Sequence, residues 1–171
     1  MKLILPIILV LILVGGYFVL KQTKPTYTPS IKQVASPSPK QNLKTFQSKF
    51  LKFSILIPKS YETNETLSYV DLIQGQLKIN ISKNSTNFLK VTDYVNDFDK
   101  KRVRLNVKNE KIGNINELES ISRLEEFTSG PITQQKIYYF YTDNKVYTIS
   151  TSSPSLYPDL DQIAQSFHYT P

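Results

Sequence analysis

The 171-residue chain contains no cysteine, no tryptophan and a single histidine, His168. The absence of cysteine excludes disulfide bonds and excludes lipid attachment through an N-terminal cysteine. One histidine near the end of the chain is too little for a histidine-based zinc site, and no pattern around it indicates a catalytic triad. We therefore interpret His168 as a solvated or packing residue.

Glycine is also scarce, with five in the chain and only three after residue 44. This leaves little material for a glycine loop that binds phosphate, and no Gly-x-Ser-x-Gly sequence occurs. Asp93, Asp97 and Asp99 with Asn96 could be arranged around calcium, but their spacing departs from the EF-hand loop and lacks its glycine. We interpret them as carboxylates on a helix surface, and predict no catalytic residue, cofactor or metal site.

The chain has one long run without charge, Leu3 to Leu20, in which 14 of 18 residues are Leu, Ile, Val or Phe. At about 1.5 Å of rise per residue, a helix of this length measures roughly 27 Å, close to the hydrocarbon thickness of a bilayer. We predict a transmembrane anchor over residues 1–20. Its apolar surface includes Leu3, Leu9, Leu13, Phe18 and Leu20.

A cleaved secretory signal is the alternative for this segment, with Lys2 as its basic start and a weak cleavage site at Val14-Gly15-Gly16. The apolar run continues to Leu20 and no Ala-x-Ala site follows, which favours an uncleaved anchor. More lysines follow the run than precede it, so the positive-inside rule alone would leave the folded part in the cytoplasm. Because the short basic start is typical of exported chains, we expect an extracytoplasmic domain.

Residues 21–44 predict a flexible stalk, because proline, serine, threonine and lysine dominate and apolar residues are too few to form a core. The formal net charge of the chain is +7, of which residues 1–44 carry +6 and residues 45–171 only +1. Nucleic acid binding requires a basic surface on the folded part of a protein. The charge distribution therefore argues against a nucleic acid partner.

Residues 45–171 are long enough for one domain with a core. Phe53–Pro58 places Phe53, Ile55 and Ile57 on one face and ends at proline, which predicts a strand. Residues 68–73 and 76–82 flank Gln74-Gly75 and predict a hairpin. Residues 118–128 are ambiguous but extended in our interpretation, ending at the Gly130-Pro131 turn.

A second hairpin is predicted at residues 132–142 and 145–152, because Asp143-Asn144 tolerates the positive φ angles of a two-residue turn. The expected opposing pairs are Phe140 with Tyr147, Tyr138 with Ile149, and Tyr141 with Val146. The aromatic run from Tyr138 to Tyr141 could form an exposed platform for a polysaccharide or a partner. Since alternate residues of a strand face opposite sides, core packing on both faces is the favoured interpretation.

Two helices are predicted. Thr92 is the expected N-cap of a helix of about ten residues, which ends in a basic cluster interpreted as solvated, Lys100-Lys101-Arg102 with Arg104. A last helix starts at Pro158. Its apolar stripe consists of Leu160, Ile163, Ala164 and Phe167.

Three of these segments together resemble the PsbP-like α/β/α sandwich superfamily. They are the Phe53–Pro58 strand followed by Tyr61, the late aromatic hairpin at 138–150, and the exit of the last helix through Ser166-Phe167. The superfamily includes extrinsic photosystem proteins, a small nuclear-import GTPase partner and membrane-anchored bacterial domains. The resemblance implies a binding or assembly module without chemistry of its own, and it carries over no functional residue.

We therefore expect an α+β fold in which a mainly antiparallel sheet has helices packed on both faces, an α/β/α sandwich over residues 45–171, preceded by one transmembrane helix. The expected function is that of a single-pass, membrane-tethered, non-catalytic module outside the cytoplasm that binds a protein partner or a small ligand. The alternative is an envelope hydrolase that uses carboxylates or a metal ion. Two converging acids with shifted pKa values would favour the enzyme, and an apolar patch or a groove at a sheet edge would favour the binding module.

Overall fold

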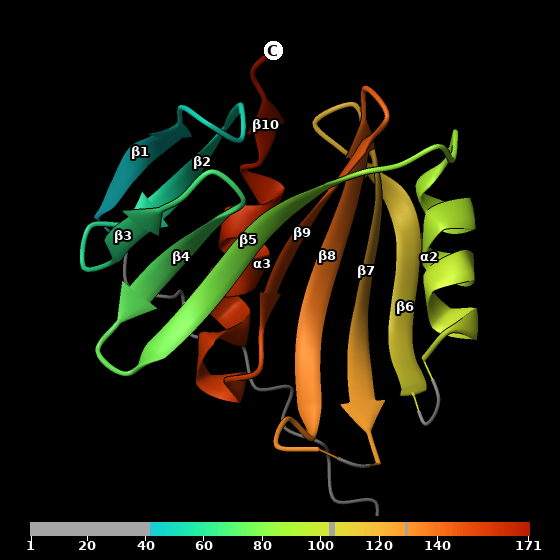
Figure 1. Ribbon diagram of the computed structural model, residues 1–171. Helices are drawn as coiled ribbons and strands as arrows, with labels where there is room; N and C mark the ends of the chain where they lie inside the picture. Colours follow the sequence, from blue (N-terminus) through green and yellow to red (C-terminus); the bar gives the residue numbers. More distant parts are fainter. Residues whose placement is uncertain (1–41, 103–104, 129) are drawn as a thin grey trace, which may run out of the picture. The chain divides into compact units, whose positions relative to one another are not determined.

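The computed structural model describes residues 42–102, 105–128 and 130–171, in which strands predominate (Figure 1). The strands are β1 (Leu43–Ser48), β2 (Phe53–Pro58), β3 (Glu62–Glu65), β4 (Tyr69–Gln74), β5 (Leu77–Ser85), β6 (Leu105–Ile115), β7 (Leu118–Phe127), β8 (Gln134–Thr142), β9 (Lys145–Thr151) and β10 (His168–Tyr169). The helices are α2 (Val91–Lys100), α3 (Tyr157–Gln165) and the short 3-10 turn η1 (Pro154–Leu156).

The strands form two antiparallel sheets. A seven-stranded sheet has the order β3-β4-β5-β9-β8-β7-β6, and a three-stranded sheet has the order β1-β2-β10. Most neighbours in the long sheet are joined by hairpins, but β9 returns from the late hairpin to pair with β5. This return brings two distant halves of the chain into one sheet, with β6 at one edge.

Both predicted hairpins are confirmed, but the turn of the first is Gly75-Gln76 rather than Gln74-Gly75. In the first, Gln74 pairs with Leu77 across a turn in which Gly75 has a φ of +61°. In the second, Thr142 pairs with Lys145, and Asp143 and Asn144 have φ values of 49° and 53°. Both central residues of this second turn have left-handed backbone conformations, as a tight turn between twisted strands requires. The three predicted cross-strand pairs of the second hairpin are also present.

Each face of the long sheet packs against its own apolar cluster, because β8 sends alternate side chains to opposite sides. Tyr138 and Phe140 belong to the larger cluster, which also contains Phe53 of β2 and Phe167 after α3. The Phe140 and Phe167 rings stack with centroids 4.6 Å apart. Ile137 and Tyr139 belong to the second cluster, under α2. The predicted burial of the aromatic run on both faces is confirmed for Tyr138, Tyr139 and Phe140, and Tyr141 is partly buried.

The expected α/β/α sandwich with helices packed on both faces is wrong. Strands account for 55% of the described residues and helices for only 17%, and both α-helices are short. Much of the cover on the α3 side is the three-stranded sheet, whose Phe53, Ile55 and Ile57 belong to the larger cluster. An apolar strand face requires burial, but a second sheet satisfies that requirement as well as a helical layer does.

The predicted helices are present with different starts. The N-cap of α2 is Lys90 rather than Thr92, and no side chain of its own caps it. Instead the Val91 N–H donates to a carboxylate oxygen of Glu119, on β7, at 2.8 Å. A partner 28 residues away satisfies the helix end, which local sequence could not reveal. Helix α3 begins one residue before Pro158 and buries three of the predicted stripe residues.

Four strands were not predicted, namely β1, β3, β6 and β10. The longest is β6, whose side chains are mostly exposed, so it has little of the apolar alternation that marks a half-buried strand. Strand β1 begins at Leu43, within the predicted stalk of residues 21–44.

The predicted anchor at residues 1–20, with Leu3, Leu9, Leu13, Phe18 and Leu20, lies outside the described residues, as do stalk residues 21–41. Within residues 42–102, 105–128 and 130–171, no helix is long and apolar enough to cross a membrane.

Candidate functional site

A groove of about 620 Å³ lies between the β6 end of the long sheet and helix α3, and we call it the β6–α3 groove. It is lined by residues 109–115 of β6, residues 120 and 122–124 of β7, Lys136 and Tyr138 of β8, and Tyr157, Asp161 and Gln165 of α3. Pockets of this size accommodate a small molecule or several side chains of a partner. It is therefore the leading candidate for a binding site.

The floor of the groove is open because small residues stand where other strands carry large ones. Ser120 and Ser122 lie opposite Phe140 and Tyr138, so their side chains share the α3 face of the sheet. Gly113 of β6 lies opposite Ser120, and a Cβ added there would meet nothing within 4 Å. Helix α3 packs over β9 and β2, and this end of the sheet extends beyond it.

A polar cluster joins the sheet to α3 at one wall of the groove. Lys136 Nζ lies 2.6 Å from Asp161 Oδ1, and the Tyr138 hydroxyl donates to the same oxygen at 2.8 Å. Burial, helped by the Asp161 carboxylate, raises the pKa of Tyr138, which keeps its hydroxyl protonated. The cluster offers donors and acceptors in fixed positions.

Tyr157 lines the same wall, and its hydroxyl is buried with no hydrogen-bond partner among the described residues. Burial raises the pKa of this hydroxyl, so it remains a neutral donor. A buried polar atom without a partner costs roughly 1–3 kcal/mol of stability. The Lys136 ammonium lies 5.7 Å from the centroid of the Tyr157 ring.

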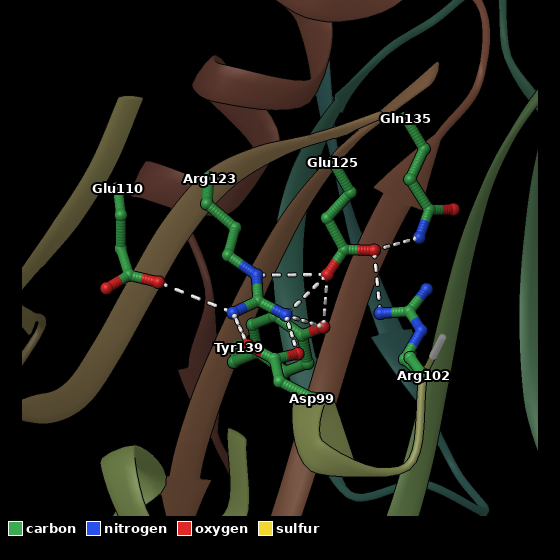
Figure 2. Close-up of polar contacts among 7 residues, drawn as sticks. All are labelled: Asp99, Arg102, Glu110, Arg123, Glu125, Gln135 and Tyr139. Carbon is green, nitrogen blue, oxygen red and sulfur yellow. Dashed lines mark hydrogen bonds and ion pairs between the residues drawn. The ribbon is translucent and has the colours of Figure 1, made fainter. Parts of the chain in front are cut away.

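The opposite face of β7 carries a buried ionic cluster (Figure 2). The guanidinium of Arg123 bonds both Asp99 oxygens at 2.6 Å, and its Nη2 donates to Glu125 Oε1 at 2.7 Å. Arg123 Nη1 also lies 3.3 Å from Glu110 of β6. The Tyr139 hydroxyl donates to Glu125 at 2.9 Å. The cluster thus joins α2, β6, β7 and β8 behind the groove floor.

The interactions within this cluster favour the ionised forms of Glu125 and Arg123. Burial by itself would raise the pKa of Glu125, but hydrogen bonds from Gln135 and Arg123 and the nearby guanidinium charges outweigh it, so the pKa is lowered. Burial would lower the pKa of Arg123, but its bonds to Asp99 and Glu125 raise it. Both side chains are buried and multiply bonded. We interpret the cluster as a structural support rather than a reacting centre.

Arg102 corrects one prediction for the basic cluster after α2. Its Nη1 lies 2.9 Å from Glu125 Oε2 in an ion pair that lacks hydrogen-bond geometry, and its guanidinium lies 4.8 Å from the Phe98 ring. Its side chain is 21% exposed, so the solvated interpretation is wrong for Arg102. Lys101 is solvated and pairs with Asp97, one turn earlier. Arg104 lies outside the described residues.

The other singled-out residues lie apart from the groove. His168 is exposed on β10, where Nδ1 lies 2.9 Å from the Ser166 carbonyl oxygen. Asp97 and Asp99 each pair with a cation rather than converge, and the residues the structure describes contain no group of three or more potential metal ligands.

Sequence reasoning missed the groove residues and the ionic cluster. The signal that was present is the alternation along β7, in which Ser120, Ser122 and Leu124 alternate with Ile121, Arg123 and Glu125. A buried Arg and Glu at alternate positions break the expected apolar pattern, which is why residues 118–128 were ambiguous.

The sequence matches no known family profile and no curated protein. Among solved structures it is similar to cyanobacterial PsbP (CyanoP) from Synechocystis, with a TM-score of 0.54 and 12% sequence identity, over 78% of this chain and 96% of that chain. It is also similar to a protein from Bacteroides thetaiotaomicron, with a TM-score of 0.52 and 11% identity, over 75% of this chain and 48% of that one.

These identities show the fold alone, and they show that the chain has a PsbP-like fold. The resemblance found in the sequence is therefore confirmed at the level of the fold. The helical layers that it implied on both faces of the sheet are wrong, because strands make up most of the domain.

Proposed function

We propose that this protein is a membrane-tethered, non-catalytic binding or assembly module that takes a protein partner or a small ligand in the β6–α3 groove. The observation that carries the proposal is the groove itself, a space of about 620 Å³ at the edge of the long sheet. It combines an unfilled floor with a Lys136–Asp161 pair and Tyr157 along one wall. A groove at a sheet edge is the feature that favours binding over catalysis.

The carboxylates of the groove support the non-catalytic part of the proposal. Asp161 accepts bonds from Lys136 and Tyr138, and Glu110 pairs with Arg123. Both of these groove carboxylates are therefore held in ion pairs with side chains of the protein itself.

The tether rests on the apolar run from Leu3 to Leu20, and the extracytoplasmic side on the basic start before it. Washing membranes with alkaline carbonate should leave the full chain in the pellet. Protease added outside intact cells or spheroplasts should digest the folded domain. Release of the uncleaved chain by carbonate, or protection until lysis, would contradict the tether or the orientation.

Capture from solubilised envelopes tests the groove. The full chain should recover a partner protein or a small molecule in stoichiometric amount, whereas Ser122→Arg, which fills the groove floor, should lose it. Ser68→Arg is the matched control, because Ser68 is exposed in the β3–β4 turn far from the groove lining. Equal recovery by Ser122→Arg and the unchanged protein would exclude the groove as the binding site.

A further inference from the structure

Strand β6 is an open edge of the long sheet. In the sheet order it has β7 on one side, and no strand of residues 42–102, 105–128 or 130–171 lies on the other. Its backbone N–H and C=O groups on that side have no strand partner, which makes an edge of this length a template for another chain. The opposite edge is the four-residue β3, which ends at Glu65 and is linked to the small sheet through Ser48.

The edge is protected over one half only. A register shift between Lys108 and Lys111, with Asn109 at a φ of 53°, interrupts regular pairing in the first half. Bulges and charged residues of this kind prevent edge-to-edge association. From Lys111 to Ile115 the pairing with β7 is regular, and Ile112 is 62% exposed. Five consecutive residues therefore present a regular and accessible edge.

The β6–α3 groove reaches this edge. Seven consecutive residues of β6, 109–115, line it. Side chains of a strand alternate between the two faces of a sheet, so a space that touches every one of seven successive residues also borders the strand's backbone. A chain lying along β6 would therefore have the groove directly beneath its inward-pointing side chains.

We propose that β6 binds an extended peptide segment of a protein partner by strand addition, with residues 111–115 supplying backbone hydrogen bonds and the β6–α3 groove receiving alternate side chains. This proposal rests on the proposed function and names its partner class and binding mode. Main-chain bonds supply affinity in this mode, and the pockets for alternate side chains supply specificity.

The groove side of β6 defines the peptide's chemistry. Lys111 lies opposite Ser122, on the groove face, and has no ion pair within the described part of the chain, so it favours an acidic residue at the adjacent position. Gly113 and Ile115 share this face with Lys111, because they follow it at alternate positions, and Gly113 leaves open space there. These positions favour apolar side chains. The fitting segment therefore has two apolar residues and one acidic residue at alternate positions.

A labelled heptapeptide, in which four threonines alternate with one glutamate and two valines, is the probe. Full-length protein in phospholipid nanodiscs should bind it in a fluorescence anisotropy titration. Two further peptides carry N-methyl groups, one on the threonine nitrogens and one on the valine and glutamate nitrogens. Because only alternate N–H groups of an added strand face β6, one methylated peptide should lose at least 10-fold in affinity and the other should retain binding.

Variants of the protein test the side-chain positions. Lys111→Glu should weaken binding at least 5-fold and should recover it for a peptide with lysine in place of glutamate. Gly113→Val should weaken binding at least 5-fold without unfolding, because its Cβ meets no atom within 4 Å and the backbone has no positive φ. Lys49→Glu, at an exposed site outside the groove, makes the same charge change and should have no effect.

Three results would overturn strand addition. They are the absence of peptide binding, equal binding of both methylated peptides, and dimers that Lys111→Glu dissociates, which would assign the edge to a second copy. If Ser122→Arg loses envelope capture and both methylated peptides bind equally, the groove remains the binding site and only strand addition to β6 is rejected. Retained capture in Ser122→Arg would reject the groove itself.

Discussion

The two faces of β7 differ in what their side chains contact. On the α2 side, Arg123 and Glu125 are buried and their charged atoms have partners (Figure 2). On the α3 side, one residue along, Ser120 and Ser122 form the floor of an unfilled groove. The comparison teaches that a strand can be rigidly held from one face while the other remains free to bind. Four experiments test this division.

Glu125→Leu should have the largest effect. It leaves Arg123 and Arg102 buried without their shared carboxylate, and breaking a buried ion pair costs about 3–5 kcal/mol of the free energy of unfolding. Urea denaturation measures the loss. Glu126→Gln is the matched control, because this neighbouring carboxylate is partly exposed and pairs with Lys108 at the surface, so it should change stability by only about 0.5 kcal/mol.

The double variant Arg123→Met with Glu125→Leu should recover a substantial part of that loss, since apolar residues of similar size can replace a buried ion pair. Equal stability of Glu125→Leu and the unchanged protein would remove the distinction between the two faces of β7.

Acid should have the next largest effect, because it protonates the Glu125 carboxylate without deleting its contacts. The pKa of Glu125 is lowered in the folded state from an ordinary value of 4.5. Its contribution to stability is therefore fully present above about pH 4.5 and is lost as the pH falls through the lowered folded value. Between pH 6 and pH 3, the midpoint temperature of thermal unfolding should fall less steeply in the Arg123→Met, Glu125→Leu double variant than in the unchanged protein. Parallel pH profiles would refute this role of Glu125.

Tyr139→Phe should have a smaller effect on the same face. It removes the hydroxyl that donates to Glu125 at 2.9 Å but keeps the buried ring. Loss of a buried hydrogen bond to a charged group costs about 1.5–3 kcal/mol of the free energy of unfolding. Tyr141→Phe, whose hydroxyl contacts Asn144 at the surface, is the control and should be neutral in the same urea titration. A neutral Tyr139→Phe would mean that the hydroxyl contributes nothing to the cluster.

Ser122→Ala should have the smallest effect on stability, about 1 kcal/mol or less, because it loses only the hydrogen bond of its hydroxyl with Tyr138 beside the groove. The neighbouring Ile121→Ala should cost about 2–5 kcal/mol in the same assay, since Ile121 is buried under α2. Similar losses at the two positions would show that both faces of β7 are packed alike.

Local sequence was sufficient for the elements whose signals lie within a few residues. The turn at Asp143-Asn144 specified the late hairpin and its register, and the alternation of Phe53–Pro58 specified β2. Strand β6 carried no such signal, because an edge strand with exposed side chains is not required to alternate. The cap of α2 and the ion pair of Arg102 with Glu125 depend on partners more than 20 residues away, which no local pattern encodes.

Sequence alone determined the long apolar run, the separation of the basic stalk from a nearly neutral domain, and both hairpins, because each depends on composition or on neighbouring residues. Only the tertiary structure decided that a second sheet covers much of one face, that β6 forms the open edge, and that a groove lies beside it. These features follow from how distant strands pair and how far α3 reaches over the sheet. Hydrophobic patterning requires that a surface be buried, and the packing of the whole domain selects what buries it.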